Sequence, residues 1–587
     1  MIKPTTFILL LLFAFFTLGM NIYTDTFLGG QGMIQTFNTI TTIEIICLVS
    51  VVFLLLSLNK KIFVSPLLSG FFLLSIIIIF SSWFNINQKW DVALSVGCIG
   101  LLAICIFIVQ QLSKFEVELL LWIILIATST QALVGLSFAY KLTINQEWFN
   151  HPFAIFKQRN VYASFLVSGL VVSVILWIKY PNNILRSAAL TLFMSILMYA
   201  IYFVRGSRTA LLSLIVIGVL LVFYICVNWH SKEPLVKQKN NTLLKWLPIF
   251  LGLVPILIAL SVSVTNNDHD KPLQEQVNIA IDRSPDKIVG ASAQARIAIY
   301  SITWDLVKRK VWTGHGYGSF TRAYEYHLSE SGIIKDYVGG SQLKHPHNII
   351  LYVWVEGGVA PVVLLFALAG AIANVLIMSG REGLLWLAVL TPISLHLLTE
   401  APFSMSVPHI LLFGLLLGGA TYQTRSRLKN KYSKVAVPAV ALVFILVVAP
   451  YAIMFGFTYN NLLTYSTKLA VHLQRSSDFL IDKSVFEGPL RYRFDQLRAE
   501  RAFQIATQTK KTSDYLRYIS QAEPLVPFLP GKNLLANLAL SYALVGNENQ
   551  GRKYFNHLAL YYPNKLNWFS LIRYYGDPTP TPLNLKE

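Results

Sequence analysis

The stretch "KHPHNIILYVWVEGG", residues 344–358, places polar residues directly in front of a long apolar run. Two histidines, a proline and an asparagine come first, and the hydrophobic sequence then continues to about residue 378. An apolar run of this length is long enough to cross a bilayer as a helix. A membrane helix needs no histidine at its N-terminal end. The stretch therefore predicts a transmembrane helix whose N-terminal end carries side chains with a function.

The composition of the whole chain agrees with a membrane protein. Its 587 residues are 55% hydrophobic and only 13% charged, and the apolar residues come in blocks of about twenty. Such a chain cannot fold around one soluble core, so we predict an all-α, polytopic integral membrane protein with about thirteen transmembrane helices. The expected spans lie near residues 5–20, 38–58, 62–82, 91–111, 117–138, 161–179, 186–203, 208–228, 243–265, 347–378, 383–399, 408–422 and 435–457.

Lysine and arginine are unevenly distributed between the hinges that join these spans. One set of alternate hinges carries most of them, for example Lys60, Lys61 and the run "TRSRLKNKYSK" at 424–434. The opposite hinges at 21–32 and 399–409 carry almost none. By the positive-inside rule the basic set is cytoplasmic, which places the N-terminus inside and the C-terminus outside. Membrane orientation then explains the formal charge of +19, and we expect no nucleic-acid partner.

Two segments between or after the spans are long, and both fall on the external side. We predict a transmembrane domain over 1–457, with residues 266–346 as its large external loop, and a helical external domain over 458–587. Within the tail, residues 533–563 show apolar positions at helical spacing that are interrupted at Gly546. This pattern is typical of a tetratricopeptide-type hairpin, although any amphipathic helix pair produces it as well.

Polar side chains gather at the external ends of several spans. They are Gln158, Arg159 and Asn160 before the sixth span, Arg205 and Arg208 before the eighth, Arg296 in the large loop, His345, His347 and Asn348 at the tenth, and Glu400 after the eleventh. Arginine is permanently charged and donates parallel hydrogen bonds, which suits a phosphate. A lipid-linked pyrophosphate is the anion expected at this depth. The alternative for a single arginine is that it reaches toward lipid headgroups.

The histidine segment predicts a proton acceptor. Pro346 is suited to the first position of a helix, so His347 and Asn348 are expected in the first turn of the tenth span. The positive end of a helix disfavours imidazolium, which keeps His347 neutral and able to act as a base. The alternative is that His345 caps the helix and His347 binds a loop carbonyl.

Two more polar residues, Tyr352 and Glu356, follow Asn348 in the tenth span. Asn348, Tyr352 and Glu356 recur at a spacing of four and form one polar stripe that is expected to face the bundle. His347 lies off this stripe, so Glu356 is not expected to be its partner. Glu400 either orients His347 or holds an arginine, and the sequence alone does not choose between these roles.

Other signals predict neither a metal site nor a cofactor site. The four cysteines lie inside apolar blocks without paired spacing, so we expect them to be packing residues. The run "GHGYG" at 314–318 follows a helical pattern and not a strand, which excludes a dinucleotide fingerprint. Its glycines either end that helix or let the backbone approach a phosphate. The run "NNDHD" at 266–270 is typical of a polar loop, and we expect no metal there.

Taken in order, "KQRN", "RGSRTA", a loop arginine, "GHGYGSF" and "HPHNIILYVWVEGG" resemble the O-antigen ligase and polymerase superfamily over residues 150–405. Members of this family move a glycan from undecaprenyl pyrophosphate on the periplasmic face of the bacterial inner membrane. The long external tail and the glutamine of "QRN" resemble the branch of PglL-type protein O-oligosaccharyltransferases. The resemblance implies that the external face is the periplasm.

The resemblance also implies a role for each candidate residue. Gln158, Arg208 and His347 match positions that the family uses for activity. The pyrophosphate would be held by the arginines, namely Arg159, Arg205, Arg208 and Arg296. His347 would take the proton of a Ser or Thr hydroxyl on a pilin or another periplasmic protein, with inversion at the anomeric carbon and without a metal or cofactor.

Two other functions stay open at this point. Within the superfamily, the acceptor can be lipid A-core sugar or a growing glycan. Outside it, the chain can be a transporter of the same lipid, but a transporter is expected to carry its polar residues near the middle of the membrane. Here they collect at one face, which favours an enzyme.

Overall fold

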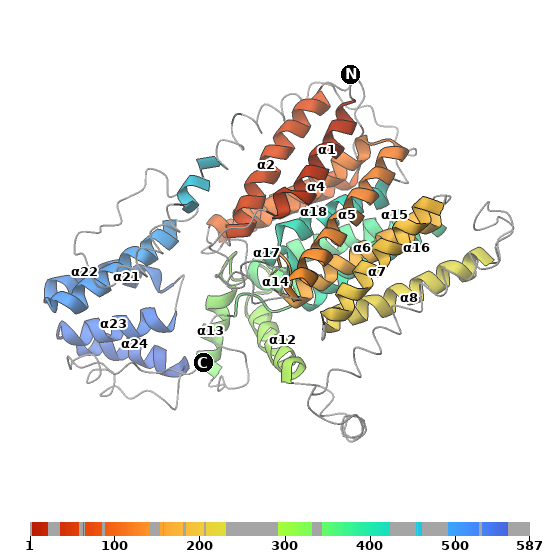
Figure 1. Ribbon diagram of the computed structural model, residues 1–587. Helices are drawn as coiled ribbons and strands as arrows, with labels where there is room; N and C mark the ends of the chain where they lie inside the picture. Colours follow the sequence, from red (N-terminus) through yellow and green to blue (C-terminus); the bar gives the residue numbers. More distant parts are fainter. Residues whose placement is uncertain are drawn as a thin grey trace, which may run out of the picture.

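A computed structural model of the protein consists of helices and loops, with no strand among the residues that it describes (Figure 1). The described residues are 3–21, 36–57, 63, 65–84, 89–139, 153–156, 158–179, 184–204, 207–229, 291–331, 343–422, 446, 453–454, 456–460, 491–527 and 531–561.

The helices follow one another in three groups. The first group is α1 (Pro4–Thr17), α2 (Thr36–Ser57), α3 (Leu67–Ser81), α4 (Lys89–Gln111), α5 (Lys114–Ala139), α6 (Arg159–Lys179), α7 (Ile184–Phe203) and α8 (Arg208–Trp229). The second group is α12 (Ala291–Arg309), α13 (Phe320–Ser331), α14 (Ile349–Gly357), α15 (Val359–Met378), α16 (Arg381–Thr399), α17 (Pro402–Met405) and α18 (Val407–Tyr422). The third group is α21 (Arg491–Thr509), α22 (Thr512–Ala522), α23 (Lys532–Leu544) and α24 (Glu548–Tyr561).

The apolar helices pack side by side into one bundle with α6 near its centre. The apolar stretch of α6 is 89% buried, and α5, α7, α8 and α16 pack against this helix. Among the described residues, 8 helices are long and apolar enough to cross a membrane. Helices α2, α3 and α18 are apolar over shorter stretches. The predicted all-α polytopic membrane fold is therefore confirmed. The expected spans at 243–265 and most of 435–457 lie outside the described residues.

The two ends of the bundle carry different polar residues. At one end α6, α8 and α18 begin and α16 ends, and Thr209 Oγ1 of α8 lies 3.2 Å from Thr399 Oγ1 of α16. At the opposite end Lys179 Nζ lies 2.7 Å from the Glu382 carboxylate. We call the end that contains Thr209 and Thr399 the site end. Gln158, which directly precedes α6, lies at this end.

The expected span 347–378 is wrong as one continuous helix, because the chain breaks at Gly358. Helix α14 ends at Gly357 and α15 begins at Val359, while Gly358 has a φ of 79°. A Cβ atom on Gly358 would stand 2.1 Å from the carbonyl oxygen of Trp312. The close approach of the loop after α12 therefore requires a glycine here, and this contact separates the short α14 from the apolar α15.

The third group of helices forms two antiparallel hairpins with a core of their own. Helix α21 pairs with α22, and α23 pairs with α24, with Gly546 at a φ of 83° in the second turn. Buried residues from all four helices form one cluster that includes Ala502, Tyr518, Leu538 and Phe555. Helix α24 of this group contacts α13 (Figure 1).

Candidate functional site

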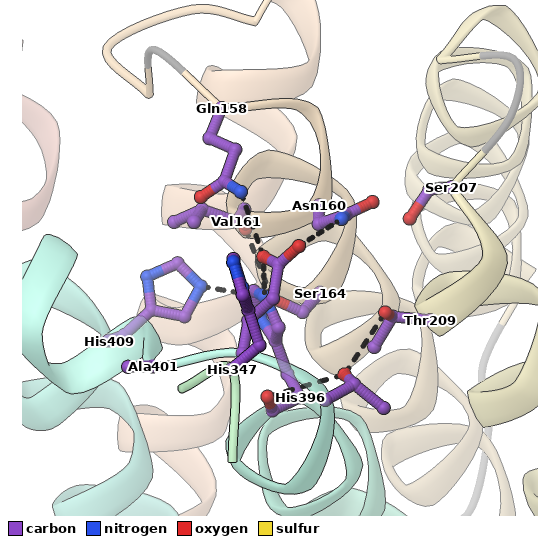
Figure 2. Close-up of polar contacts among 12 residues, drawn as sticks. Gln158, Asn160, Val161, Ser164, Ser207, Thr209, His347, His396, Ala401 and His409 are labelled. Atoms are coloured by element: carbon purple, nitrogen blue, oxygen red, sulfur yellow. Dashed lines mark hydrogen bonds and ion pairs between the residues drawn. The ribbon is translucent and has the colours of Figure 1, made fainter. Parts of the chain in front are cut away.

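Glu400 is the centre of the polar residues at the site end. The whole residue is 2% exposed, and four donors point at its carboxylate. Gln158 Nε2 lies 2.9 Å from Oε2, and Asn160 Nδ2 lies 2.7 Å from Oε1. Arg296 Nη2 lies 3.0 Å from Oε1, and His396 Nε2 lies 3.0 Å from Oε2. Figure 2 shows Gln158 and Asn160 at the start of α6 and His396 on α16.

Local structure explains how three distant segments meet at this carboxylate. Glu400 follows the last residue of α16, and its N–H is bonded to the carbonyl of His396 at 2.8 Å, which holds the side chain beside that turn. Gln158 and Asn160 stand at the start of α6, which packs along α16. Arg296 comes from α12, so a residue of the large loop reaches the end of the bundle.

The charge of Glu400 is stabilised by these contacts. Burial raises the pKa of the carboxyl, but hydrogen bonds from His396 and Asn160 and the charges near it outweigh this effect, so the pKa lies below its ordinary value. An ionised carboxylate accepts about four hydrogen bonds, and all four are used here. Of the two roles that the sequence left open, the geometry shows Glu400 holding an arginine, because no hydrogen bond joins it to His347 among the described residues.

Behind Glu400 a chain of hydrogen bonds runs into the interior of the bundle. His396 Nδ1 lies 2.8 Å from Ser164 Oγ, and Ser164 Oγ lies 3.2 Å from His409 Nε2. His409 Nδ1 lies 2.9 Å from Ser406 Oγ. All of these residues are 2% exposed or less. We call Ser164, His396, Ser406 and His409 the buried chain.

Sequence reasoning missed the buried chain. Polar residues inside apolar spans are a signal for function or for a specific polar contact, and His396 precedes Glu400 by one helical turn in "LHLLTE". That spacing alone points to a contact between the two side chains. The partners Ser164 and His409 lie on other helices, and no pattern in a single sequence joins them.

The structure corrects the start of the helix after the two histidines. Asn348 is the N-cap of α14, since its side-chain oxygen accepts hydrogen bonds from the N–H groups of Ile350 and Leu351 at 2.9 and 3.1 Å. The strong preference of asparagine for this position explains why the helix starts after it and not at Pro346. His347 thus lies outside the helix, with a φ of 57° that places it in the left-handed region.

The two histidines differ in their surroundings. His345 is 8% exposed, and burial lowers its pKa to about 3. Burial also lowers the pKa of His347, opposed by Glu400 and helped by Arg296, so burial and not the helix end is the main reason for its neutral ring. His347 Nδ1 is buried without a hydrogen-bond partner in the part of the chain that the structure describes.

Backbone contacts hold the histidine segment in place. Tyr300 Oη donates to the carbonyl oxygen of His347 at 3.1 Å, and the N–H of His347 points at His345 Nδ1 at 3.4 Å. Asn348 Nδ2 donates to the carbonyl of Leu398 in α16 at 3.1 Å. The segment is therefore tied to α12 on one side and to α16 on the other.

The rest of the expected polar stripe supports the glycine-rich loop. Glu356 Oε1 accepts hydrogen bonds from the N–H groups of Gly318 and Phe320 at 3.0 and 3.4 Å. Tyr352 packs edge-on against Phe320, with 6.0 Å between ring centres. The N–H of Gly316 also bonds to the carbonyl of Glu356 at 3.0 Å. These amides are engaged by α14, so the loop has a structural role and does not present them to a phosphate.

The other predicted arginines lie at the starts of helices or outside the described residues. Arg208 is the first residue of α8 and is exposed, and the structure shows no hydrogen bond or ion pair for it among the described residues. Ser207 Oγ, just before it, accepts from the N–H of Ala210 at 3.3 Å and caps the helix. Arg159 is the exposed first residue of α6. Arg205 lies outside the described residues, as does the run 266–270.

Comparison with protein families identifies two matching regions. Residues 189–367 match the model described as O-antigen ligase. Residues 384–570 match the model described as virulence factor membrane-bound polymerase, C-terminal. The chain belongs to the O-antigen ligase superfamily. A comparison with curated proteins gave no match.

The two matched regions divide the residues of the candidate site. In this member of the O-antigen ligase superfamily, the first region contains Arg208, Arg296 and His347, and the second contains Glu400. Gln158 precedes both regions, yet the structure brings it to the same carboxylate. The second region runs on through the helical hairpins of the C-terminal part. The first description names an O-antigen ligase and the second a membrane-bound polymerase, so the chain is a multi-pass membrane protein of a glycan-transferring family.

Proposed function

We propose that the protein transfers a glycan from an undecaprenyl pyrophosphate-linked donor to Ser or Thr hydroxyls of a pilin or another periplasmic protein. The observation that carries this proposal is the convergence on Glu400 of Gln158, Asn160 and Arg296, close to His347, at one end of the bundle. A lipid-linked donor keeps its pyrophosphate at this depth. The site end would therefore face the periplasm.

On the donor side, the arginines would hold the pyrophosphate. Arg208 is exposed at the start of α8, where the positive end of a helix also favours an anion. Arg159 has the same position on α6. Arg296 uses one nitrogen for Glu400 and keeps other N–H groups for a ligand. These groups stabilise the negative charge that develops on the leaving group.

On the acceptor side, His347 would act as the general base. No hydrogen bond engages its ring nitrogens among the described residues, and only Nδ1 is enclosed, so Nε2 is the atom that a substrate reaches. The hydroxyl oxygen forms a bond to the anomeric carbon as its proton passes to His347. The bond from that carbon to the pyrophosphate oxygen breaks, and the electron pair leaves with the pyrophosphate. One such displacement inverts the anomeric carbon.

Gln158 offers a second group for substrate. Its Oε1 is buried and has no hydrogen-bond partner in the described part of the chain, while its Nε2 is held by Glu400. A buried acceptor without a partner calls for an explanation, and a substrate O–H or N–H group would supply one.

Reconstitution tests the proposed acceptor. Purified protein receives a synthetic undecaprenyl pyrophosphate-linked oligosaccharide together with a pilin, with lipid A-core, or with no added acceptor, and mass spectrometry detects the products. Glycosylated Ser or Thr on the pilin is the expected result. Transfer only to lipid A-core shows a ligase, and lengthening of the lipid-linked glycan shows a polymerase. Movement of donor across a vesicle without transfer shows a transporter.

The same reaction tests whether a metal is needed. The leaving group is already activated and the site end is rich in arginine, so we expect transfer to continue in EDTA. Loss of transfer in EDTA followed by recovery on addition of Mg²⁺ or Mn²⁺ would contradict this part of the proposal.

A further inference from the structure

Glu400 determines which way the amide of Gln158 points. An ionised carboxylate can only accept, so Gln158 must turn its nitrogen toward Glu400 and its oxygen away (Figure 2). The freed Oε1 is the buried atom without a partner. Asn160 is fixed in the same manner, because its nitrogen also faces the carboxylate. The charge on one residue therefore decides which atom Gln158 offers to a ligand.

The same carboxylate determines the proton on His396. Because Glu400 only accepts, His396 Nε2 must carry a hydrogen. Arg296 already balances the charge of Glu400, and a second cation in this buried position would be uncompensated. We therefore place a single hydrogen on this ring, so that its Nδ1 accepts a hydrogen bond from the hydroxyl of Ser164. The carbonyl of Val161 is the alternative acceptor for that hydroxyl, but it lies farther away, at 3.1 Å against 2.8 Å.

The remaining protons follow from this assignment. Ser164 gives its only hydrogen to His396, so its oxygen accepts from His409 Nε2, whose hydrogen also faces the carbonyl of Val161. His409 Nδ1 then accepts from the hydroxyl of Ser406. Every hydrogen bond of the buried chain points toward Glu400. Such aligned bonds polarise and strengthen one another.

The surroundings make the buried chain a support and not a path for protons. Phe156 and Phe165 enclose the ring of His409, with ring centres 5.3 and 5.4 Å away. The far end of the chain is Ser406, which is 2% exposed. A proton that entered at Glu400 would have no outlet to solvent at Ser406.

We propose that Ser164, His396 and His409 are positioning residues that hold Glu400 as an acceptor, so that Gln158 keeps its oxygen free for substrate and Arg296 stays in place. This inference rests on the proposed function, because it assigns these residues to the glycan-transfer site. None of the three is expected to touch substrate, since each is 1% exposed or less.

The first test reads the protons directly and needs no activity. In protein labelled with ¹⁵N-histidine, solid-state NMR reports which nitrogen of each ring carries hydrogen, and His396→Gln and His409→Gln proteins assign the signals. We expect both rings to be neutral with hydrogen on Nε2. Hydrogen on Nδ1 of either ring, or on both nitrogens, would overturn the inference whether or not the protein transfers glycan.

The second test uses transfer from synthetic undecaprenyl pyrophosphate-linked oligosaccharide to a pilin. His396→Leu removes the donor to Glu400, and we expect kcat to fall about 10²-fold with little change in the KM for donor, as for a small misplacement of reacting groups. His396→Gln keeps an N–H donor near the same place and should recover most of this loss. A similar rate in the leucine and glutamine variants would contradict a positioning role.

Ser164→Ala tests the next residue of the buried chain after His396. This substitution removes only a hydroxyl and is smaller than the replacement of His396. The matched control is Ser173→Ala, because Ser173 is also fully buried on α6 but, among the described residues, bonds only to the carbonyl of Leu170 in its own helix, at 2.6 Å. We expect Ser164→Ala alone to lower kcat, with both variants unfolding at similar temperatures. Equal kcat values for the two variants would overturn the role of Ser164. A further outcome is that wild-type protein shows the expected protons on its histidines and still transfers no glycan. In that case the hydrogen bonds that hold Glu400 are confirmed and the proposed function is wrong.

Discussion

The guanidinium of Arg296 lies 3.0 Å from the carboxylate of Glu400, and this ion pair joins α12 to the end of α16. The glutamate side chain is 3% exposed and the arginine side chain 26%. Because the carboxylate is enclosed, removing its charge leaves several donors without an acceptor, which costs far more than loss of a surface ion pair.

Replacement of Glu400 by glutamine should abolish most transfer. The new amide brings two hydrogens toward donors that already face the site, so at least one of Gln158, Asn160 and Arg296 must turn away. We expect transfer to fall about 10²-fold, as when reacting groups shift by about 1 Å. The control is Glu382→Gln, which removes an ion pair with Lys179 at the other end of the bundle and should leave transfer unchanged. Equal rates for the two variants would contradict the role of Glu400.

His347→Ala should separate chemistry from donor binding. The arginines are untouched, so we expect the variant to insert and to bind undecaprenyl pyrophosphate, while transfer falls by about 10² to 10⁴. Arg208→Ala should instead raise the KM for donor. His345→Ala should mainly lower stability, because that ring is buried. If His347→Ala transfers normally while His345→Ala is well folded but inactive, then His345 is the base and His347 has the structural role.

The pH dependence of transfer should reflect the environment of His347. Burial lowers its pKa below the ordinary histidine value of about 6.5. A base acts when neutral, so the rate should rise as pH increases through the lowered pKa and should be constant above it. The pH of half-maximal kcat/KM is therefore expected below about 6.5. A midpoint above that value, measured at saturating donor and limiting acceptor, would argue against a buried histidine as the base.

Gly358→Ala should destabilise the join between α14 and α15. The added Cβ would meet the carbonyl of Trp312 at 2.1 Å, and the φ of 79° disfavours any side chain. Strain of this kind costs about 1 to 3 kcal/mol, and thermal unfolding in detergent measures it. Gly370→Ala in α15 is the control, since nothing lies within 4 Å of its Cβ position. An unchanged unfolding temperature for Gly358→Ala would show that the loop can move aside.

Much of the architecture follows from the hydrophobic runs. The polar residues at the span ends were predicted to share one face, and Gln158, Asn160, Arg296 and Glu400 do meet there. Their catalytic and binding roles stay predictions. The meeting point is Glu400 and not His347, because hydrogen-bond partners depend on helix packing that one sequence does not show.

Two sequence preferences for the start of a helix conflicted before α14, and the prediction followed the wrong one. Pro346 favours the first turn of a helix and Asn348 favours the N-cap, and the asparagine prevailed because its side chain accepts two backbone hydrogens. The break at Gly358 was missed because the residues on both sides are equally apolar. It becomes evident only from the contact with Trp312, which is distant in sequence.

Asn348 has a consequence for the acceptor. Its oxygen holds the first turn of α14 and its nitrogen holds the last turn of α16, so the residue next to His347 is fastened on two sides. The backbone of His347 is itself held by Tyr300. A base that is held this rigidly cannot move toward a hydroxyl whose own position is fixed in a folded surface. We therefore expect modification to favour serines and threonines in pliable, extended stretches, which can bring their hydroxyl to the histidine.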